Sequence, residues 1–201
     1  MRVQLYRFFT GVLHEGASRR FLTGVALVAA VPLGAQAPRT HRLEATPATV
    51  AYGHYWSETR PVLTIASGDV LDVDTLITST PDRLEKAGVK AADIQPSLRA
   101  IVEQVKDRGP GGHILTGPVY VTGAEPGDAL EVRVLSIDLP IAYGYNGCSG
   151  FIRENCVPGR GPAIIPLDRQ AMTATFLPGI VIPLRRSSAA WAWRRRLRWA
   201  G

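Results

Sequence analysis

His113 is the residue of this sequence whose type and position best suit chemistry. It follows Gly111-Gly112, where the backbone is unobstructed, and precedes a run of β-type residues that would hold its ring in place. An imidazole can exchange protons near neutral pH or bind a metal ion through one nitrogen. His54, beside Tyr55 and Trp56, is a second candidate of the same kind. A lone histidine in a loop is more often ordinary polar surface, so these two need independent support.

Carboxylates near the predicted turns are the next candidates. Asp69 and Asp128 each follow a glycine in a Gly-Asp-x-Leu-x-Val segment, where the glycine can take a positive φ and the aspartate can bind the local backbone. Turn stabilisation explains these aspartates better than catalysis does. Glu125 is harder to explain by turn geometry, and it could activate a water molecule or bind a metal ion if it faces His113. Glu125 is thus the first candidate for a catalytic carboxylate, and Asp128, in the same turn, is kept as the second although the structural role suits it better.

The elements that must position these side chains are mostly strands. Residues 119–121 and 129–137 are β-type runs on either side of Glu125-Pro126-Gly127-Asp128, which predicts a hairpin. Residues 61–65 and 70–77 predict a second hairpin around another Gly-Asp turn. The two Gly-Asp segments form a weak internal repeat. We therefore expect a mostly-β fold, a sandwich or barrel built from similar hairpins.

Two short helices are predicted between these hairpins. Thr80 suits an N-cap with Pro81 at the first helical position, and Gly88 ends this first helix. A second helix begins near Pro96 and ends before Gly109, and its apolar residues have helical i, i+3, i+4, i+7 spacing: Leu98, Ile101, Val102 and Val105. The other side of this helix mixes both charge signs. It is expected to cover a sheet rather than bind a membrane.

The distribution of charge excludes nucleic-acid binding. The formal net charge is +6, but residues 1–37 hold four Arg and one Glu, and residues 185–201 hold six Arg and no acid. Residues 38–184 hold thirteen basic and sixteen acidic side chains. Because binding to phosphates requires the positive charge on the folded domain, we expect no nucleic-acid partner.

The N-terminal segment has the pattern of a signal peptide. Arg19-Arg20 precede the apolar run 21–31, which is too short to span a bilayer, and Ala35-Gln36-Ala37 matches a cleavage site. We predict that residues 1–37 are removed and that the protein is periplasmic or secreted, with no membrane contact afterwards. The export route stays open, because the arginine pair lies one residue too close to the phenylalanine for a twin-arginine signal. An uncleaved membrane anchor is the alternative.

After this segment, residues 38–48 are predicted to be a polar entry segment and residues 49–184 the β domain. Cys148 and Cys156 are the two cysteines of the chain. In an oxidising compartment they could form a disulfide, or they could be two free thiols. Neither lies beside a histidine in sequence, which disfavours a cysteine nucleophile.

The string H-x-x-T-G-P-x-Y-V-x-G-A-E-P-G-D-x-L-x-V, residues 113–132, resembles the acetamidase/formamidase family of amide hydrolases, as do residues 54–56 and 61–69. The similarity extends from Thr46 to Pro183, about the N-terminal half of a typical member. It implies hydrolysis of the carbon–nitrogen bond of small linear amides such as formamide or acetamide. It also implies a divalent metal ion, zinc first, that lowers the pKa of a bound water.

The resemblance makes His113 and His54 candidate metal ligands. Catalytic zinc sites generally take three protein ligands, and the later Gly, Asp, His and Glu-rich segment of the family has no counterpart here. The runner-up is therefore a catalytically inactive β module, either a truncated relic or a binding domain. A copper-binding sandwich is disfavoured, because the required His, Cys and Met cluster is absent.

The last segment, residues 185–201, departs from the rest of the chain. It contains three of the four tryptophans. Back-translation of residues 186–196 in a shifted frame permits Pro-Phe-Phe-Gly-Ser-Met-Gly-Val-Ala-Pro-Pro, which resembles what family members carry after this strand. We therefore expect residues 185–201 to be a non-native basic tail produced by a frameshift, leaving an incomplete domain.

Overall fold

The computed structural model describes residues 1–8, 37–55, 59–125, 127–147 and 163–186. Strands make up 40% of this part of the chain and helices 13%, and its several sheets do not close into a barrel. The predicted mostly-β fold with inserted helices is confirmed.

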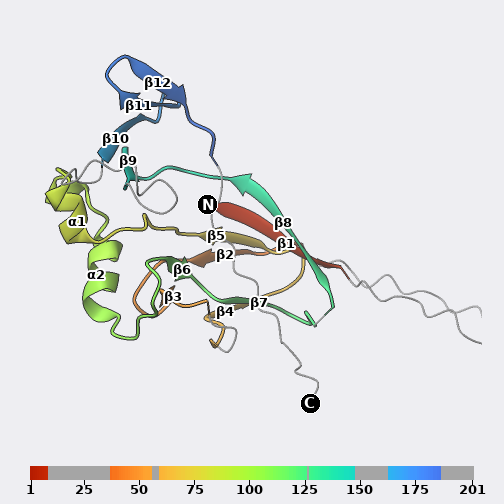
Figure 1. Cartoon of the computed structure of the whole chain (residues 1–201). Helices are drawn as coiled ribbons and strands as arrows, with labels where there is room; N and C mark the ends of the chain where they lie inside the picture. Colours follow the sequence, from red (N-terminus) through yellow and green to blue (C-terminus); the bar gives the residue numbers. More distant parts are fainter. Residues whose placement is uncertain (9–36, 56–58, 126, 148–162, 187–201) are drawn as a thin grey trace, which may run out of the picture.

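One four-stranded sheet forms the centre of the molecule, with the strand order β2-β5-β1-β8 (Figure 1). Its strands are β1 (Arg2–Phe8), β2 (Thr40–Leu43), β5 (Val70–Val73) and β8 (Ala129–Ser136). Strand β1 is antiparallel to both of its neighbours, and β2 is parallel to β5. The first residues of the chain thus lie inside the sheet.

A second layer packs against this sheet. It consists of β4 (Leu63–Ile65) and β7 (Val119–Val121), which pair in parallel. The two layers share one apolar core, whose buried residues are Val3, Leu5, Leu43, Ile65, Leu71, Val73 and Val121. Two packed β layers around a common core are the arrangement of a sandwich.

The two predicted hairpins are wrong in their pairing. Strand β4 does not pair with β5, nor β7 with β8, because β1 lies between β5 and β8 and pairs with both. Each Gly-Asp turn instead carries the chain from the small layer to the large sheet. The internal repeat is real, but it produces two similar arches rather than two hairpins.

The two turns have the same hydrogen bonds. In the first, Asp69 N donates to Ala66 O and Ala66 N donates to the Asp69 carboxylate, at 3.2 and 3.0 Å. In the second, Asp128 N donates to Glu125 O and Glu125 N donates to the Asp128 carboxylate, at 3.1 and 2.8 Å. The glycine before each aspartate has a positive φ of 91° or 102°, which favours glycine at these positions.

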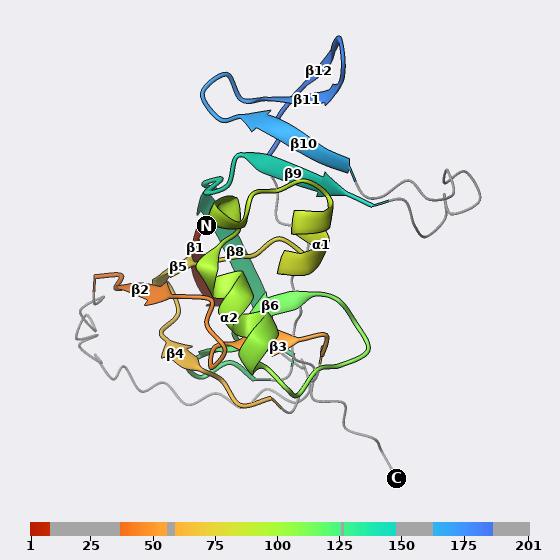
Figure 2. The same cartoon turned by 90° about the vertical axis from the view of Figure 1, so that its left-hand side faces the viewer.

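The helical insert covers the side of the molecule facing the viewer in Figure 2. Helix α1 (Pro81–Lys86) is capped by Thr80 as predicted, and a 3-10 turn, Ala91–Asp93, leads to α2 (Pro96–Gln104). Leu98 and Ile101 are fully buried, so the predicted apolar face of α2 is confirmed. Ile101 packs on the antiparallel pair β3 (Val50–Tyr52) and β6 (Ile114–Thr116).

A second four-stranded sheet, of order β12-β11-β10-β9, lies above the helices in Figure 2. It contains β9 (Tyr143–Asn146), β10 (Ala163–Asp168), β11 (Thr173–Leu177) and β12 (Ile180–Pro183). Tyr143 of β9 is buried against Leu84 and Leu98 of the helices. The other end of this sheet is exposed, including the apolar side chains of β12.

The predicted polar entry segment, residues 38–48, contains an ordered strand. Residues 40–43 form β2, and Leu43 is buried in the main core. Contacts with residues distant in sequence hold this strand: Arg42 pairs with Asp74, and His41 with Asp69. Local composition does not reveal such partners.

The predicted signal peptide begins with β1, and its removal remains a prediction about processing. Its apolar run, Ala35 and Gln36 of its cleavage pattern, both cysteines and residues 187–201 of the predicted tail lie outside the described residues. Within the part that is described, no helix is long and apolar enough to cross a membrane.

Candidate functional site

Two glycine-rich segments cross next to His113. Gly53 follows β3, and Gly109 to Gly112 lead from α2 toward β6. Three backbone hydrogen bonds hold the crossing: Gly109 N donates to Tyr52 O at 2.9 Å, Gly111 N to Gly53 O at 3.2 Å, and Gly53 N to His113 O at 2.8 Å. The backbones approach so closely that only glycine fits at Gly53 and Gly109. A Cβ on Gly53 would lie 2.5 Å from Gly111 O, and one on Gly109 would overlap Gly53 O.

The crossing places His113 at the surface with one ring nitrogen open. Its Nδ1 lies 3.5 Å from the Thr78 hydroxyl, and its ring meets the Tyr55 ring edge-on at 6.1 Å between centroids. The Nε2 atom has no hydrogen-bond partner in the described part of the chain. A neutral imidazole held in this way can present Nε2 to a water molecule or a substrate.

His54 lies at the same crossing, but its Nε2 is engaged and its Nδ1 is close to a glycine backbone. Its Nε2 is 3.2 Å from the Asp107 carboxylate. Its Nδ1 lies over the backbone of Gly109, 2.7 Å from where a Cβ would be. The structure therefore brings the two predicted histidines to one loop crossing while leaving His113 the more available of the two. Sequence reasoning missed Asp107 and Thr78, which carry no local signal.

The expected zinc ion needs more ligands than this crossing offers. No group of three or more His, Cys, Asp or Glu side chains among the described residues could hold a metal ion. His113 supplies one open nitrogen, while His54 faces Asp107 and a glycine backbone. A catalytic zinc site takes about three protein ligands. The donors within the described ranges do not fit the ion.

Glu125 and Asp128 lie away from this crossing. His113 comes just before β6, whereas both carboxylates follow β7 in the turn to β8. The Glu125 side chain is exposed and makes no contact with His113 in the described structure. The structure thus brings these carboxylates together with each other and not with the histidines.

Asp128 is engaged in holding the turn. Its carboxylate accepts the Glu125 N–H and forms an ion pair with the Arg7 guanidinium from β1. The backbone hydrogen bond from Glu125 and the Arg7 guanidinium together hold the pKa of Asp128 below its usual value, against a smaller opposing effect of burial. The carboxylate stays ionised in these contacts, which suits a structural role more than proton transfer.

Asp69 has the equivalent arrangement in the first turn. It is 6% exposed, and its carboxylate accepts N–H groups from Arg39 and Ala66, both at 3.0 Å. The His41 Nε2 atom lies 2.7 Å from the same carboxylate. Burial raises the pKa of Asp69, but the hydrogen bonds from Arg39, His41 and Ala66 lower it further, and the net shift is downward. His41 is thus a structural partner of this turn.

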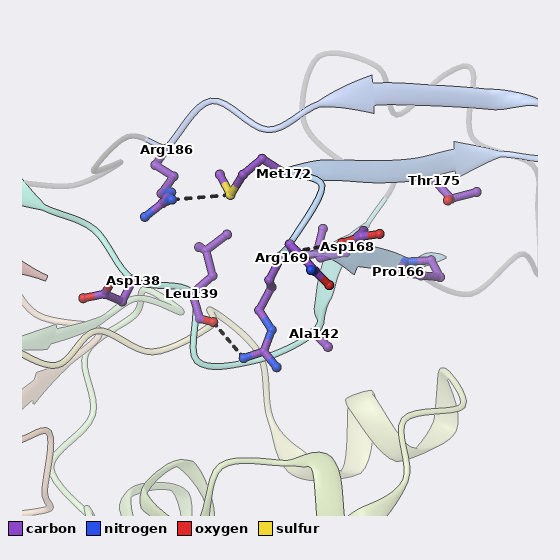
Figure 3. Close-up of a pocket in the computed structure, with 11 residues that line it drawn as sticks. Asp138, Leu139, Ala142, Pro166, Asp168, Arg169, Met172, Thr175 and Arg186 are labelled. Atoms are coloured by element: carbon purple, nitrogen blue, oxygen red, sulfur yellow. Dashed lines mark hydrogen bonds between the residues drawn. The ribbon is translucent and has the colours of Figure 1, made fainter.

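A hollow of about 790 Å³ lies elsewhere, between the segment after β8 and the β10–β11 turn. Figure 3 shows Arg169 directed at the Leu139 carbonyl and Arg186 directed at the Met172 sulfur. None of the sequence-predicted site residues lines this hollow. Both guanidinium groups are committed to protein acceptors.

The family model described as Acetamidase/Formamidase family matches residues 55–184. The chain belongs to the acetamidase/formamidase family. No curated protein sequence matches the chain significantly.

The acetamidase/formamidase match covers some of the candidate residues and excludes others. His113, Glu125 and Asp128 lie inside it, and His54 lies one residue before it. Strands β1 and β2 lie outside the match, although β1 occupies the middle of the central sheet. Arg7 and His41, the partners of the two turn aspartates, therefore come from outside the family region.

Proposed function

We propose that the chain hydrolyses small linear amides such as formamide and acetamide, with His113 as the reacting side chain. Membership of the acetamidase/formamidase family, shown by the match over residues 55–184, is the observation that carries this proposal. It implies amide hydrolysis in general. The choice of small linear amides as substrates rests on the family, and the choice of residues is inferred from the loop crossing.

Hydrolysis of an amide adds water to the carbonyl carbon and releases ammonia and a carboxylate. The attacking water must lose a proton, and the departing nitrogen must gain one. His113 suits both steps, because its Nε2 is open and Thr78 lies beside Nδ1. A proton accepted from water at Nε2 can then pass to the leaving nitrogen.

The backbone beside His113 suits the developing negative charge on the carbonyl oxygen. The N–H of Gly112 has no hydrogen-bond partner within the described residues. A fixed backbone donor beside the base is the arrangement that stabilises an oxyanion. Gly112 also leaves space above the backbone, since the nearest atom to an added Cβ is 4.0 Å away.

A divalent metal ion, with zinc as the first choice, belongs to this proposal as an expectation from the family. His113 would then hold the ion through Nε2 instead of accepting the proton there, and further ligands would have to come from outside the described residues. A bound zinc would activate water near neutral pH. Glu125 and Asp128 also stay predictions as catalytic groups. Export to the periplasm or medium is proposed on the N-terminal pattern alone.

The competing proposal is an inactive β module of the same family. It is favoured by one observation, the absence of a three-ligand group among the described side chains. The two proposals make opposite predictions for turnover by the purified protein.

Ammonia release from formamide and acetamide decides between them. The full chain is assayed after zinc loading and after chelation, beside His113→Ala and the control His41→Gln, whose side chain lies away from the loop crossing. Release by the wild type and by His41→Gln, but not by His113→Ala, is expected. Release at the buffer rate by zinc-loaded, folded wild type would leave only the inactive module.

A further inference from the structure

Strand β1 occupies a position between β5 and β8 in the central sheet, which we call the slot. The two arches of the internal repeat run in parallel, and in the small layer their strands β4 and β7 pair directly. In the large sheet the corresponding strands β5 and β8 do not pair, because β1 lies between them. In the small layer the two repeat strands are therefore direct neighbours, whereas in the large sheet a gap one strand wide separates them.

Strand β1 occupies this slot. It pairs with β8 from Arg2 to Phe8, with a shift of register between Arg2 and Val3, and with β5 from Arg2 to Gln4. At its start, the N-terminal amine donates to Val73 O at 2.9 Å. Backbone bonds continue to the first Gly-Asp turn, where Gly68 N donates to Leu5 O. Main-chain pairing on both sides is what an added strand needs for affinity.

Side chains of β1 give the slot its selectivity. Val3 and Leu5 are 0% and 5% exposed and enter the main core. Arg7 pairs with the carboxylate of Asp128, and its backbone N–H donates to the Ser67 hydroxyl at 2.9 Å. The slot therefore accepts an extended segment with apolar residues two positions apart, followed two positions later by a basic residue.

We propose that β5 and β8 form an acceptor groove for an extended segment, and that Arg2–Phe8 binds it as a separable donor strand. The groove is built from the family region, whereas the donor lies outside it and reaches the next described residue only at position 37. A cut between residues 8 and 37 of the folded chain then leaves the donor strand bound. This inference does not depend on the proposed hydrolase activity.

A cleavable full-length chain tests this. A recognition sequence for a site-specific protease is inserted after Gly16, and the purified, folded chain is cut and passed through a gel-filtration column. The N-terminal fragment is expected to co-elute with the rest, and the cut protein to keep its circular dichroism spectrum. Separation of the fragment from the remainder, whether or not the remainder unfolds, would overturn the proposal.

Peptide exchange tests the selectivity on the same cut protein. A labelled peptide of residues 1–8 is expected to replace the bound fragment, and Leu5→Asp in the peptide to weaken binding by about tenfold or more, since it puts a charge in the core. Phe8→Asp is the matched control, because Phe8 is 47% exposed, and less than about a threefold change is expected. Equal binding of the two variant peptides would contradict the groove.

Discussion

Gly109→Ala should disrupt the loop crossing that holds His113, whereas Gly112→Ala should not. Both substitutions add one methyl group to the same loop. At Gly109 the new Cβ would overlap Gly53 O and lie 2.5 Å from Gly53 C, whereas at Gly112 the nearest atom is 4.0 Å away. The two variants therefore carry the same change of side chain and differ only in what the new methyl group contacts.

The magnitude follows from the hydrogen bonds at stake. To relieve the overlap, the two backbones must separate enough to break the three bonds that join Tyr52, Gly53, Gly109, Gly111 and His113. At about 0.5–1.5 kcal/mol each, their loss costs roughly 1.5–4.5 kcal/mol. For a chain of this size that corresponds to a fall in Tm of about 3–18 °C. Gly112→Ala should stay within about 0.5 kcal/mol of wild type.

Urea unfolding followed by circular dichroism measures both variants under one condition. A clear drop in the midpoint for Gly109→Ala, with an unchanged midpoint for Gly112→Ala, is expected. Equal midpoints for the two variants would refute the crossing as described. The histidine ring signals by NMR add a local readout, because His54 Nδ1 lies over Gly109 and its shifts should change only in the first variant.

Three further predictions concern the core and the turns. Asp69→Asn should lower the free energy of unfolding at pH 7 by about 2 kcal/mol, the scale of a lost charge-assisted bond. Because the folded pKa of Asp69 lies below the ordinary 3.8, the stabilisation from ionised Asp69 is present above that value and is lost as the pH falls through the folded pKa. Acid titrations of unfolding should thus differ least between wild type and Asp69→Asn at the lowest pH, and a gap that persists there would contradict the assignment. Leu98→Ala, at a side chain that is 0% exposed, should cost about 2–5 kcal/mol in urea unfolding, and a loss below about 1 kcal/mol would place α2 off the core. Tyr143→Phe removes a buried hydroxyl that has no hydrogen-bond partner among the described residues, so calorimetry should show equal or higher stability, and a marked loss would reveal a partner for that hydroxyl.

Local signals in the sequence were sufficient for the helices. The side chain of Thr80 accepts the Arg83 N–H at the start of α1, as the Thr-Pro pair predicts, and Leu98 and Ile101 face the core as their spacing predicts. Helix caps and helical spacing depend on residues within one or two turns. They can therefore be recognised without knowing what packs against the helix.

Strand pairing could not be predicted in the same way. The alternating pattern of residues 129–136 identifies a strand, but it does not say which strand lies beside it. The short turn before it suggested β7, whereas the neighbour is β1, more than a hundred residues earlier. Pairing is decided by contacts between distant segments, which a local pattern does not contain.

In the candidate site too, local features could be predicted from the sequence and contacts between distant residues could not. Gly111-Gly112 marked His113 correctly as a residue on an open loop. The pairing of His54 with Asp107, and that of His41 with Asp69, join residues 53 and 28 positions apart. Nothing near these histidines in sequence distinguishes the open imidazole from the two that are engaged.

Product analysis of a labelled amide tests the proposed hydrolase most directly. ¹³C-formamide is incubated with the zinc-loaded full chain, and formate and ammonium are followed by NMR. The account predicts that the two products appear in equal amounts, that His113→Ala abolishes both, and that His41→Gln retains them. Unchanged formamide with folded wild type, or equal turnover by His113→Ala, would contradict it.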